Sequence, residues 1–211
     1  MSDGVRNEIN IKVLVLFIIH MYKKLNISDK HLIVLTLFTS GPATQLFVRE
    51  VARKAAIAPR TAQLILDSLE SRGVLRSEVK GKIRLFSLKE NLAQKTYLAM
   101  AEEYKRLQLI KDPLIYAVVE EMLSHTTGVV LVFGSYAKGL QRKDSDLDVM
   151  VVGEYDDDAV RKISRTYQLD VSIKKVSGNP FEAPLKDPLF LEILANHVVL
   201  SGTDEFVKML G

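Results

Sequence analysis

A glycine and a serine at the end of an apolar run are the first candidates for chemistry. Gly134 and Ser135 directly follow residues 129–133, which have the length and composition of a strand. Glycine lets the backbone turn sharply and approach a ligand closely, and a short helix opening at Ser135 would direct backbone N–H groups toward an anion. A triphosphate would suit this position, with Lys138 and Arg142 supplying positive charge.

Two carboxylates follow this turn. Asp146 and Asp148 come after a gap of ten residues and open the apolar segment Leu147–Val152. Residues two apart on a strand point to the same face, so both carboxylates would share one side. Such a pair repels itself unless a proton or a divalent cation intervenes. Hard oxygen ligands beside a phosphate favour Mg²⁺ or Mn²⁺.

A third carboxylate, Asp170, lies in the apolar segment Leu169–Ile173, which we expect to be a strand. An unpaired buried carboxylate is costly, which favours a ligand role. If this strand lies beside the one that carries Asp146 and Asp148, the three side chains would hold two metal ions. The acidic cluster at Asp156–Asp158 is expected instead at a helix start, where acids interact favourably with the helix dipole.

The segments around these residues resemble the signature of the DNA polymerase β nucleotidyltransferase superfamily. The matching parts are Gly134-Ser135, Asp146-Leu147-Asp148 and the later apolar-Asp-apolar triplet at Asp170. The compact form is similar to the minimal nucleotidyltransferases of prokaryotes, although Lys138 stands where arginine is common. The resemblance runs from Asp112 to the end of the chain. It implies Mg²⁺-dependent or Mn²⁺-dependent transfer of a nucleoside monophosphate to a hydroxyl, with pyrophosphate leaving.

The same resemblance suggests roles and partners. Asp170 would be the general base or a ligand on the side of the nucleophile, and catalysis would rest on positioning and charge neutralisation. Minimal nucleotidyltransferases are often paired with a HEPN-domain toxin, and some adenylylate a tyrosine on it. A HEPN-type toxin protein is therefore one expected partner, and AMP from ATP the expected group.

The elements that must position this site form an α/β pattern that begins after a break at Asp112-Pro113. We expect an α/β (α+β) domain over residues 112–211 with a short mixed sheet. Its expected strands are 129–133, 147–152, 169–173 and 198–200, and its expected helices are 114–123, 157–166 and 188–196. Residues 91–111 are expected to form a connecting helix, with the domain boundary near Lys111.

Residues 28–90 resemble a winged helix-turn-helix domain. We expect a helix from Asp29 to Ser40, a short helix capped by Thr44 that runs through Ala52, and a third helix from Pro59 that stops at Gly73. A β-hairpin of residues 74–79 and 83–88 would follow as the wing.

This domain carries two sets of candidate DNA-binding residues. At the start of the third helix, away from its apolar face, base edges would be read by Arg60, Thr61 and Gln63. Phosphates would be contacted by three cations of the wing, Lys80, Lys82 and Arg84. Winged helices also serve as protein-interaction or dimerisation modules, so double-stranded DNA and a protein remain alternative partners.

Composition supports this division of the chain. Residues 1–90 hold 15 Lys and Arg against 8 Asp and Glu, whereas residues 126–211 hold 10 against 13. The basic half suggests a polyanionic partner, and the acidic half with its clustered Asp suggests a metal site. The absence of cysteine excludes disulfides and thiolate chemistry, which fits a cytoplasmic protein.

The apolar stretch at residues 13–22 lies within an N-terminal segment, residues 1–27. Ten residues cannot span a bilayer as a helix, and no small-residue cleavage site follows as in a signal peptide. We expect a buried element or a helix that forms a homodimer, and no membrane partner. The leading functional class is an enzyme. The competing class is a DNA-binding regulator whose transferase fold senses nucleotide or binds a partner without turnover.

Overall fold

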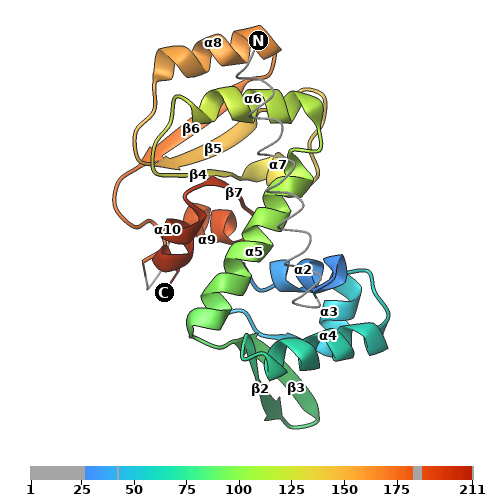
Figure 1. Ribbon diagram of the computed structural model, residues 1–211. Helices are drawn as coiled ribbons and strands as arrows, with labels where there is room; N and C mark the ends of the chain where they lie inside the picture. Colours follow the sequence, from blue (N-terminus) through green and yellow to red (C-terminus); the bar gives the residue numbers. More distant parts are fainter. Residues whose placement is uncertain (1–26, 42, 183–186, 211) are drawn as a thin grey trace, which may run out of the picture.

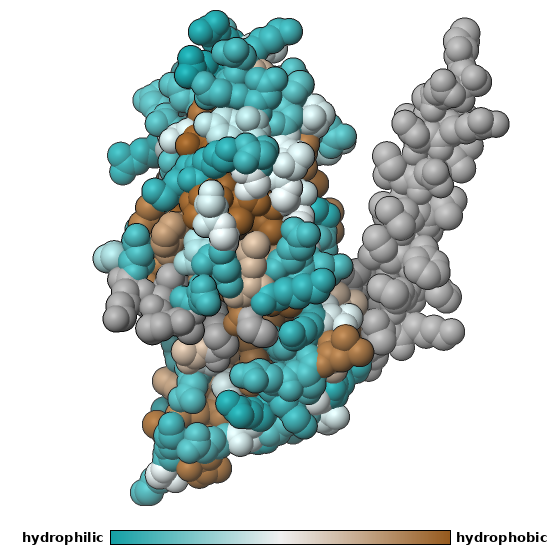
Figure 2. Space-filling view, turned by 90° about the vertical axis from the view of Figure 1, so that its left-hand side faces the viewer, coloured by the Kyte–Doolittle hydropathy of each residue, from teal (hydrophilic) through white to brown (hydrophobic). Residues whose placement is uncertain are grey.

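The computed structural model describes residues 27–41, 43–182 and 187–210. The expected dimerisation segment therefore lies almost entirely outside the described residues. Figure 1 shows a lower lobe of helices with a hairpin, an upper lobe around a sheet, and a long helix running between them. On the face shown in Figure 2, hydrophilic residues dominate and apolar ones gather mainly near the middle of the molecule. No helix in the described ranges is long and apolar enough to cross a membrane.

The lower lobe is a winged helix, as the sequence predicts. Its elements are α2 (Asp29–Thr36), β1 (Leu46–Phe47), α3 (Val48–Lys54), α4 (Pro59–Ser71), β2 (Leu75–Lys80) and β3 (Ile83–Leu88). The strands form an antiparallel sheet in the order β1-β3-β2. Pro59 occupies the first turn of α4, where its missing N–H costs nothing. Gly81 turns the hairpin with a φ of +63°.

Two predicted helix bounds in this lobe are wrong. Helix α2 ends at Thr36, and residues 37–40 form turns rather than a further helical turn. The second helix begins at Val48 and not near Thr44, because Leu46 and Phe47 pair with β3 as a short strand. Tertiary pairing has overridden the local helical pattern in this segment.

Helix α5 (Leu92–Leu109) joins the two lobes and packs on both. The Asn91 side chain caps it by accepting from the Gln94 N–H. Tyr97, Leu98 and Ala101 belong to the winged-helix core. The same helix contacts β7 (Val198–Ser201) and α10 (Thr203–Met209) of the upper lobe. It is therefore a shared structural element rather than a free linker.

The upper lobe contains a four-stranded mixed sheet. Its further elements are α6 (Pro113–Leu123), β4 (Val129–Val132), α7 (Gly134–Ala137), β5 (Leu147–Val152), α8 (Asp157–Tyr167), β6 (Val171–Val176) and α9 (Pro188–Ala195). The strand order is β6-β5-β4-β7, with β5 and β6 parallel and the other pairs antiparallel. One face buries its apolar side chains against α6 and α8, and the other against α9 and α10. The predicted mixed α/β fold is confirmed.

The third predicted strand is displaced. It was expected at Leu169–Ile173, but β6 runs from Val171 to Val176, so Asp170 lies just before it. Helix α8 begins where the acidic cluster predicts, since the Asp156 side chain accepts from the Ala159 N–H. Helix α10 was not predicted at all. Its buried Phe206 and Val207 pack beneath the sheet and against α5.

Candidate nucleotide and metal site

The turn between β4 and α7 brings the glycine and one carboxylate into direct contact. Gly134 has a φ of +69°, a backbone conformation that favours glycine. A Cβ atom at this residue would overlap the carboxylate of Asp148. The Phe133 N–H also donates to the Asp148 carbonyl oxygen at 2.9 Å. The predicted phosphate-binding turn and the predicted carboxylate strand therefore meet at residue 134.

The Asp146–Asp148 pair is positioned by strand alternation. Leu147 and Val149 are fully buried on the α6 and α8 side, so the two aspartates share the opposite face. Asp146 is exposed and Asp148 is half-buried. Partial burial and the neighbouring Asp146 carboxylate raise the pKa of Asp148. Among the described residues, no Lys, Arg or His forms an ion pair with either aspartate.

Asp170 is beside this pair but is not buried. The Leu147 N–H donates to the Asp170 carbonyl oxygen at 2.8 Å, and Leu147 is paired with Val171. The register therefore sets the backbone of Asp170, just before β6, next to that of Asp146, just before β5. The side chain is exposed, so the expectation of a costly buried carboxylate is wrong. No three His, Cys, Asp or Glu side chains in the described ranges lie close enough together to enclose a metal ion.

The carboxylates nevertheless fit a hard divalent cation. Asp146 and Asp148 offer oxygen ligands on one face, lack a compensating cation within the part of the chain that the structure describes, and repel each other. Mg²⁺ is commonly held by one or two carboxylates together with phosphates and water. A two-carboxylate set beside a phosphate-binding turn is sufficient for that mode of binding.

The remaining predicted nucleotide-binding residues are placed differently. Ser135 is half-buried in α7, and its carbonyl accepts from the Leu140 N–H at 2.9 Å. The Lys138 ammonium pairs with Glu192 of α9 at 2.6 Å. Arg142 is exposed, and its backbone N–H donates to Ser145 Oγ at 2.8 Å. Lys138 is thus engaged within the protein, whereas the Arg142 side chain is open to solvent.

Tyr136 is a site residue that the sequence analysis did not single out. It is half-buried in α7. Its pKa is raised by burial and by the carboxylates of Asp112 and Asp146. The side chain therefore lies within electrostatic reach of both Asp146 and Asp112, at the start of α6. Its position directly after Gly134-Ser135 was the available signal.

Some of the predicted DNA-binding side chains are exposed to solvent, and others contact residues of the protein. Arg60 and Lys82 are exposed and Thr61 is half-buried. Gln63 donates to Asp67 at 2.9 Å, and Lys80 lies 3.6 Å from Glu78. The guanidinium of Arg84 pairs with Asp67 and Glu70 of α4 and lies over the Phe86 ring. Arg84 therefore ties the wing to α4 instead of pointing to solvent.

Comparison with known families identifies the class of the upper lobe. Residues 115–198 match the family described as "Nucleotidyltransferase domain". This part of the chain is therefore a nucleotidyltransferase domain, and it contains all seven residues predicted for the nucleotide and metal site.

Several solved structures are also similar to the chain. They include Sso10a-2, a DNA-binding protein from Sulfolobus solfataricus, with 18% identity over 36% of this chain and 79% of that chain and a TM-score of 0.31. YusO from Bacillus subtilis has 19% identity over 59% and 97%, with a TM-score of 0.35. The adhesin competence repressor from Streptococcus pyogenes has 17% identity over 56% and 92%, with a TM-score of 0.33. A search of curated proteins found no significant match.

Proposed function

We propose that the protein is a Mg²⁺-dependent or Mn²⁺-dependent nucleotidyltransferase that transfers AMP from ATP to a hydroxyl of a protein or other acceptor. The observation that carries this proposal is the contact between Gly134 and the Asp148 carboxylate. It joins a turn suited to phosphate with a carboxylate pair suited to a divalent cation. The family match of residues 115–198 supports the same class of reaction.

Each site residue has a role in this reaction. Asp146 and Asp148 would hold the metal ion, which when bound neutralises triphosphate charge. The backbone at Gly134 and Ser135, together with Arg142, would bind phosphate oxygens, and Lys138 would do so after leaving Glu192. The acceptor oxygen forms a bond to the α-phosphorus while the bond from that phosphorus to pyrophosphate breaks.

Asp170 is proposed to act at the acceptor. Its exposed side chain lies just before the edge strand β6, and its backbone carbonyl oxygen accepts from the Leu147 N–H, beside Asp146. A solvent-facing position lets an incoming hydroxyl reach it, and the carboxylate would accept the proton that the hydroxyl loses. The winged helix would recruit the acceptor, either as double-stranded DNA or as a partner protein. A tyrosine of a HEPN-type toxin is one such acceptor.

A second function is a DNA-binding regulator that binds nucleotide without turnover. The observation that favours it is the ion pair of Lys138 with Glu192, which engages a predicted phosphate contact within the protein. Catalytic transfer is therefore the measurement that separates the two functions.

The test combines nucleotide binding with transfer. ATP, CTP, GTP and UTP are titrated calorimetrically with Mg²⁺, and labelled nucleotide is followed onto acceptors, including a HEPN-type protein where one is encoded nearby. The double variant Asp146→Asn, Asp148→Asn should lose metal-dependent binding and transfer. Asp144→Asn, an exposed aspartate in the preceding loop, is the matched control and should behave as wild type. Binding without transfer to any acceptor would favour the regulator, and no binding would refute both.

A further inference from the structure

A cavity lies where the two lobes meet. Its volume is about 400 Å³, which is within the range of small-molecule sites. Thr36 of α2 and Tyr104 and Gln108 of α5 line it on the winged-helix side. Tyr136 and Gln141 line it on the nucleotidyltransferase side. Both lobes therefore contribute to its wall.

The chemistry of the cavity suits a flat, partly polar molecule. Tyr104 and Tyr136 offer aromatic faces, and the amide of Gln141 offers a donor and an acceptor. The amide of Gln108 offers its N–H donors, while its Oε1 accepts from Lys111 Nζ at 2.6 Å. Apolar side chains, including Ile115 of α6, complete the lining. Aromatic stacking combined with amide hydrogen bonds is a common way to hold a nucleobase.

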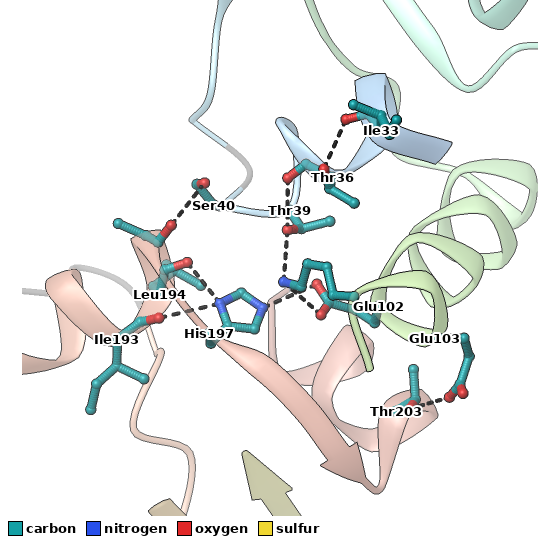
Figure 3. A network of polar contacts seen from close by, with 12 residues as sticks. Ile33, Thr36, Thr39, Ser40, Glu102, Glu103, Ile193, Leu194, His197 and Thr203 are labelled. Atoms are coloured by element: carbon teal, nitrogen blue, oxygen red, sulfur yellow. Dashed lines mark hydrogen bonds and ion pairs between the residues drawn. The ribbon is translucent and has the colours of Figure 1, made fainter. Parts of the chain in front are cut away.

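A buried polar network includes two residues that line this cavity, Lys105 and His197 (Figure 3). Lys105 Nζ lies 2.7 Å from Glu102 Oε2 and 3.1 Å from Thr39 Oγ1. His197 Nε2 lies 3.0 Å from Glu102 Oε1, while its Nδ1 lies 2.9 Å from the Leu194 carbonyl oxygen. Both ring nitrogens of His197 thus face oxygen atoms of neighbouring residues.

This network joins three parts of the chain. Thr39 follows α2, Glu102 and Lys105 lie on α5, and His197 follows α9. Lys105 and His197 also line the cavity. Because their partners come from both lobes, the two side chains are held before any ligand arrives. The cavity is therefore pre-organised rather than formed on binding.

The cavity borders the segment that carries the candidate phosphate-binding turn. Lys138 and Gly139 line it and belong to the segment that opens with Gly134 and Ser135. Tyr136 lies within electrostatic reach of Asp112, at the cavity wall, and of Asp146, at the metal site. A nucleotide whose phosphates lie at Gly134 would extend along this segment into the cavity.

We propose that this cavity binds the base and ribose of the nucleoside triphosphate, so that α2 and α5 complete the nucleotide site. The inference rests on the proposed nucleotide binding and assigns its nucleoside half. The bound nucleoside would then contact both lobes, because Thr36 and Tyr104 line the cavity on the winged-helix side.

The test introduces a large side chain into the cavity from each of the two lobes in turn. Gln108→Trp and Gln141→Trp each place a large ring into it, and both parent side chains are exposed, so folding should be retained. Leu107→Trp is the matched control, since Leu107 is the adjacent exposed residue of α5 and does not line the cavity. Binding of ATP with Mg²⁺ is compared with binding of inorganic tripolyphosphate with Mg²⁺, after thermal unfolding has verified the fold of each variant.

We expect both cavity-filling variants to weaken ATP binding at least tenfold and to leave tripolyphosphate binding unchanged. Leu107→Trp should match wild type with both probes. Wild-type ATP affinity in both filled variants would overturn this inference alone, as would an equal loss of tripolyphosphate binding. Failure of the wild-type protein to bind any nucleoside triphosphate would overturn the proposed function and this inference with it.

Discussion

Two groups of carboxylates in this molecule differ in whether neighbouring cations compensate their charge. At the start of β5, burial and mutual repulsion raise the pKa of Asp148, and no ion pair compensates the Asp146–Asp148 pair among the described residues. At the lobe junction, burial alone would raise the pKa of Glu102, but the charges and hydrogen bonds of His197 and Lys105 lower it to about 2. The Asp146–Asp148 pair is therefore an unbalanced pair, whereas Glu102 with Lys105 and His197 forms a balanced group.

This difference distinguishes the proposed metal site from a structural ion network. The buried carboxylate of Glu102 is compensated within the protein by Lys105 and His197. It stabilises the junction between the lobes while both of these side chains are present. A pair of aspartates without a cation destabilises the free protein and is relieved by a bound metal ion. The wing shows the same distinction, because Arg84 is balanced by Asp67 and Glu70 while Arg60 and Lys82 are open.

The largest effect is expected from breaking the balanced group. Glu102→Gln leaves Lys105 and His197 without their buried counter-charge and should lower the free energy of unfolding by about 3–5 kcal/mol. Glu103→Gln is the control on the same helix. Its partly exposed pairs with Arg106 and Thr203 should be worth about 0–1 kcal/mol. Urea unfolding at pH 7 measures both.

The pH dependence of the same variant gives a second readout. The folded-state pKa of Glu102 is depressed from 4.5 to about 2, so its stabilisation is complete above pH 4.5. As the pH falls from 4.5 toward 2, that contribution is lost, and the stabilities of wild type and Glu102→Gln should converge. A difference that stayed constant down to pH 2 would contradict an ionised Glu102.

The second-largest effect is expected from a substitution at Gly134, where the turn contacts the carboxylate of Asp148. Gly134→Ala introduces a Cβ atom into the Asp148 carboxylate and should weaken Mg²⁺-dependent nucleotide binding at least ~100-fold, or about 2.7 kcal/mol. Gly81→Ala imposes the same kind of backbone strain, at a φ of +63° with no atom within 4 Å of the added Cβ. It should cost stability only. Calorimetric titration of both variants decides whether the clash or the strain matters.

Features of the site that depend on local sequence could be predicted, whereas features that depend on contacts between distant segments could not. Gly134, Asp146 and Asp148 were predictable because a turn and a period-two pattern within one short segment position them. The start of β6 was misplaced, because Leu169 and Asp170 look like strand residues until the pairing with β5 sets the register. The exposure of Asp170 followed from that register and not from its apolar neighbours.

Long-range contacts were not predictable in the same way. Glu102 and Lys105 look like members of a solvated helix face, yet Glu102 is 1% exposed. His197, which follows α9, contacts Glu102, and Thr39, which follows α2, accepts from Lys105. Arg84 looked like a phosphate contact, but its carboxylate partners lie on another element. In both cases the partner is far away in the chain, and only the fold reveals it.

A smaller effect is expected at the wing. If the winged helix binds DNA, Arg60→Ala with Lys82→Ala should weaken binding by about 1–3 kcal/mol through the lost base contact, and the lost phosphate contact of Lys82 should reduce the slope of log affinity against log salt by about 1. Arg84→Ala should leave the salt slope unchanged and instead lower stability by about 1 kcal/mol. Fluorescence anisotropy with duplex DNA at several salt concentrations measures the slopes. Equal slopes for all variants would favour a protein partner.

The smallest effect is a gain of stability at the unbalanced pair. Without metal, Asp148→Asn removes the repulsion with Asp146 and should raise the free energy of unfolding at pH 7 by about 0.5–1 kcal/mol, as for like charges on a sheet. Because the folded-state pKa of Asp148 is raised, its penalty is present at neutral pH and is relieved as the pH falls through that pKa. Mg²⁺ should then stabilise wild type more than the variant. A metal-free Asp148→Asn protein less stable than wild type would mean that the carboxylate is structural, like Glu102.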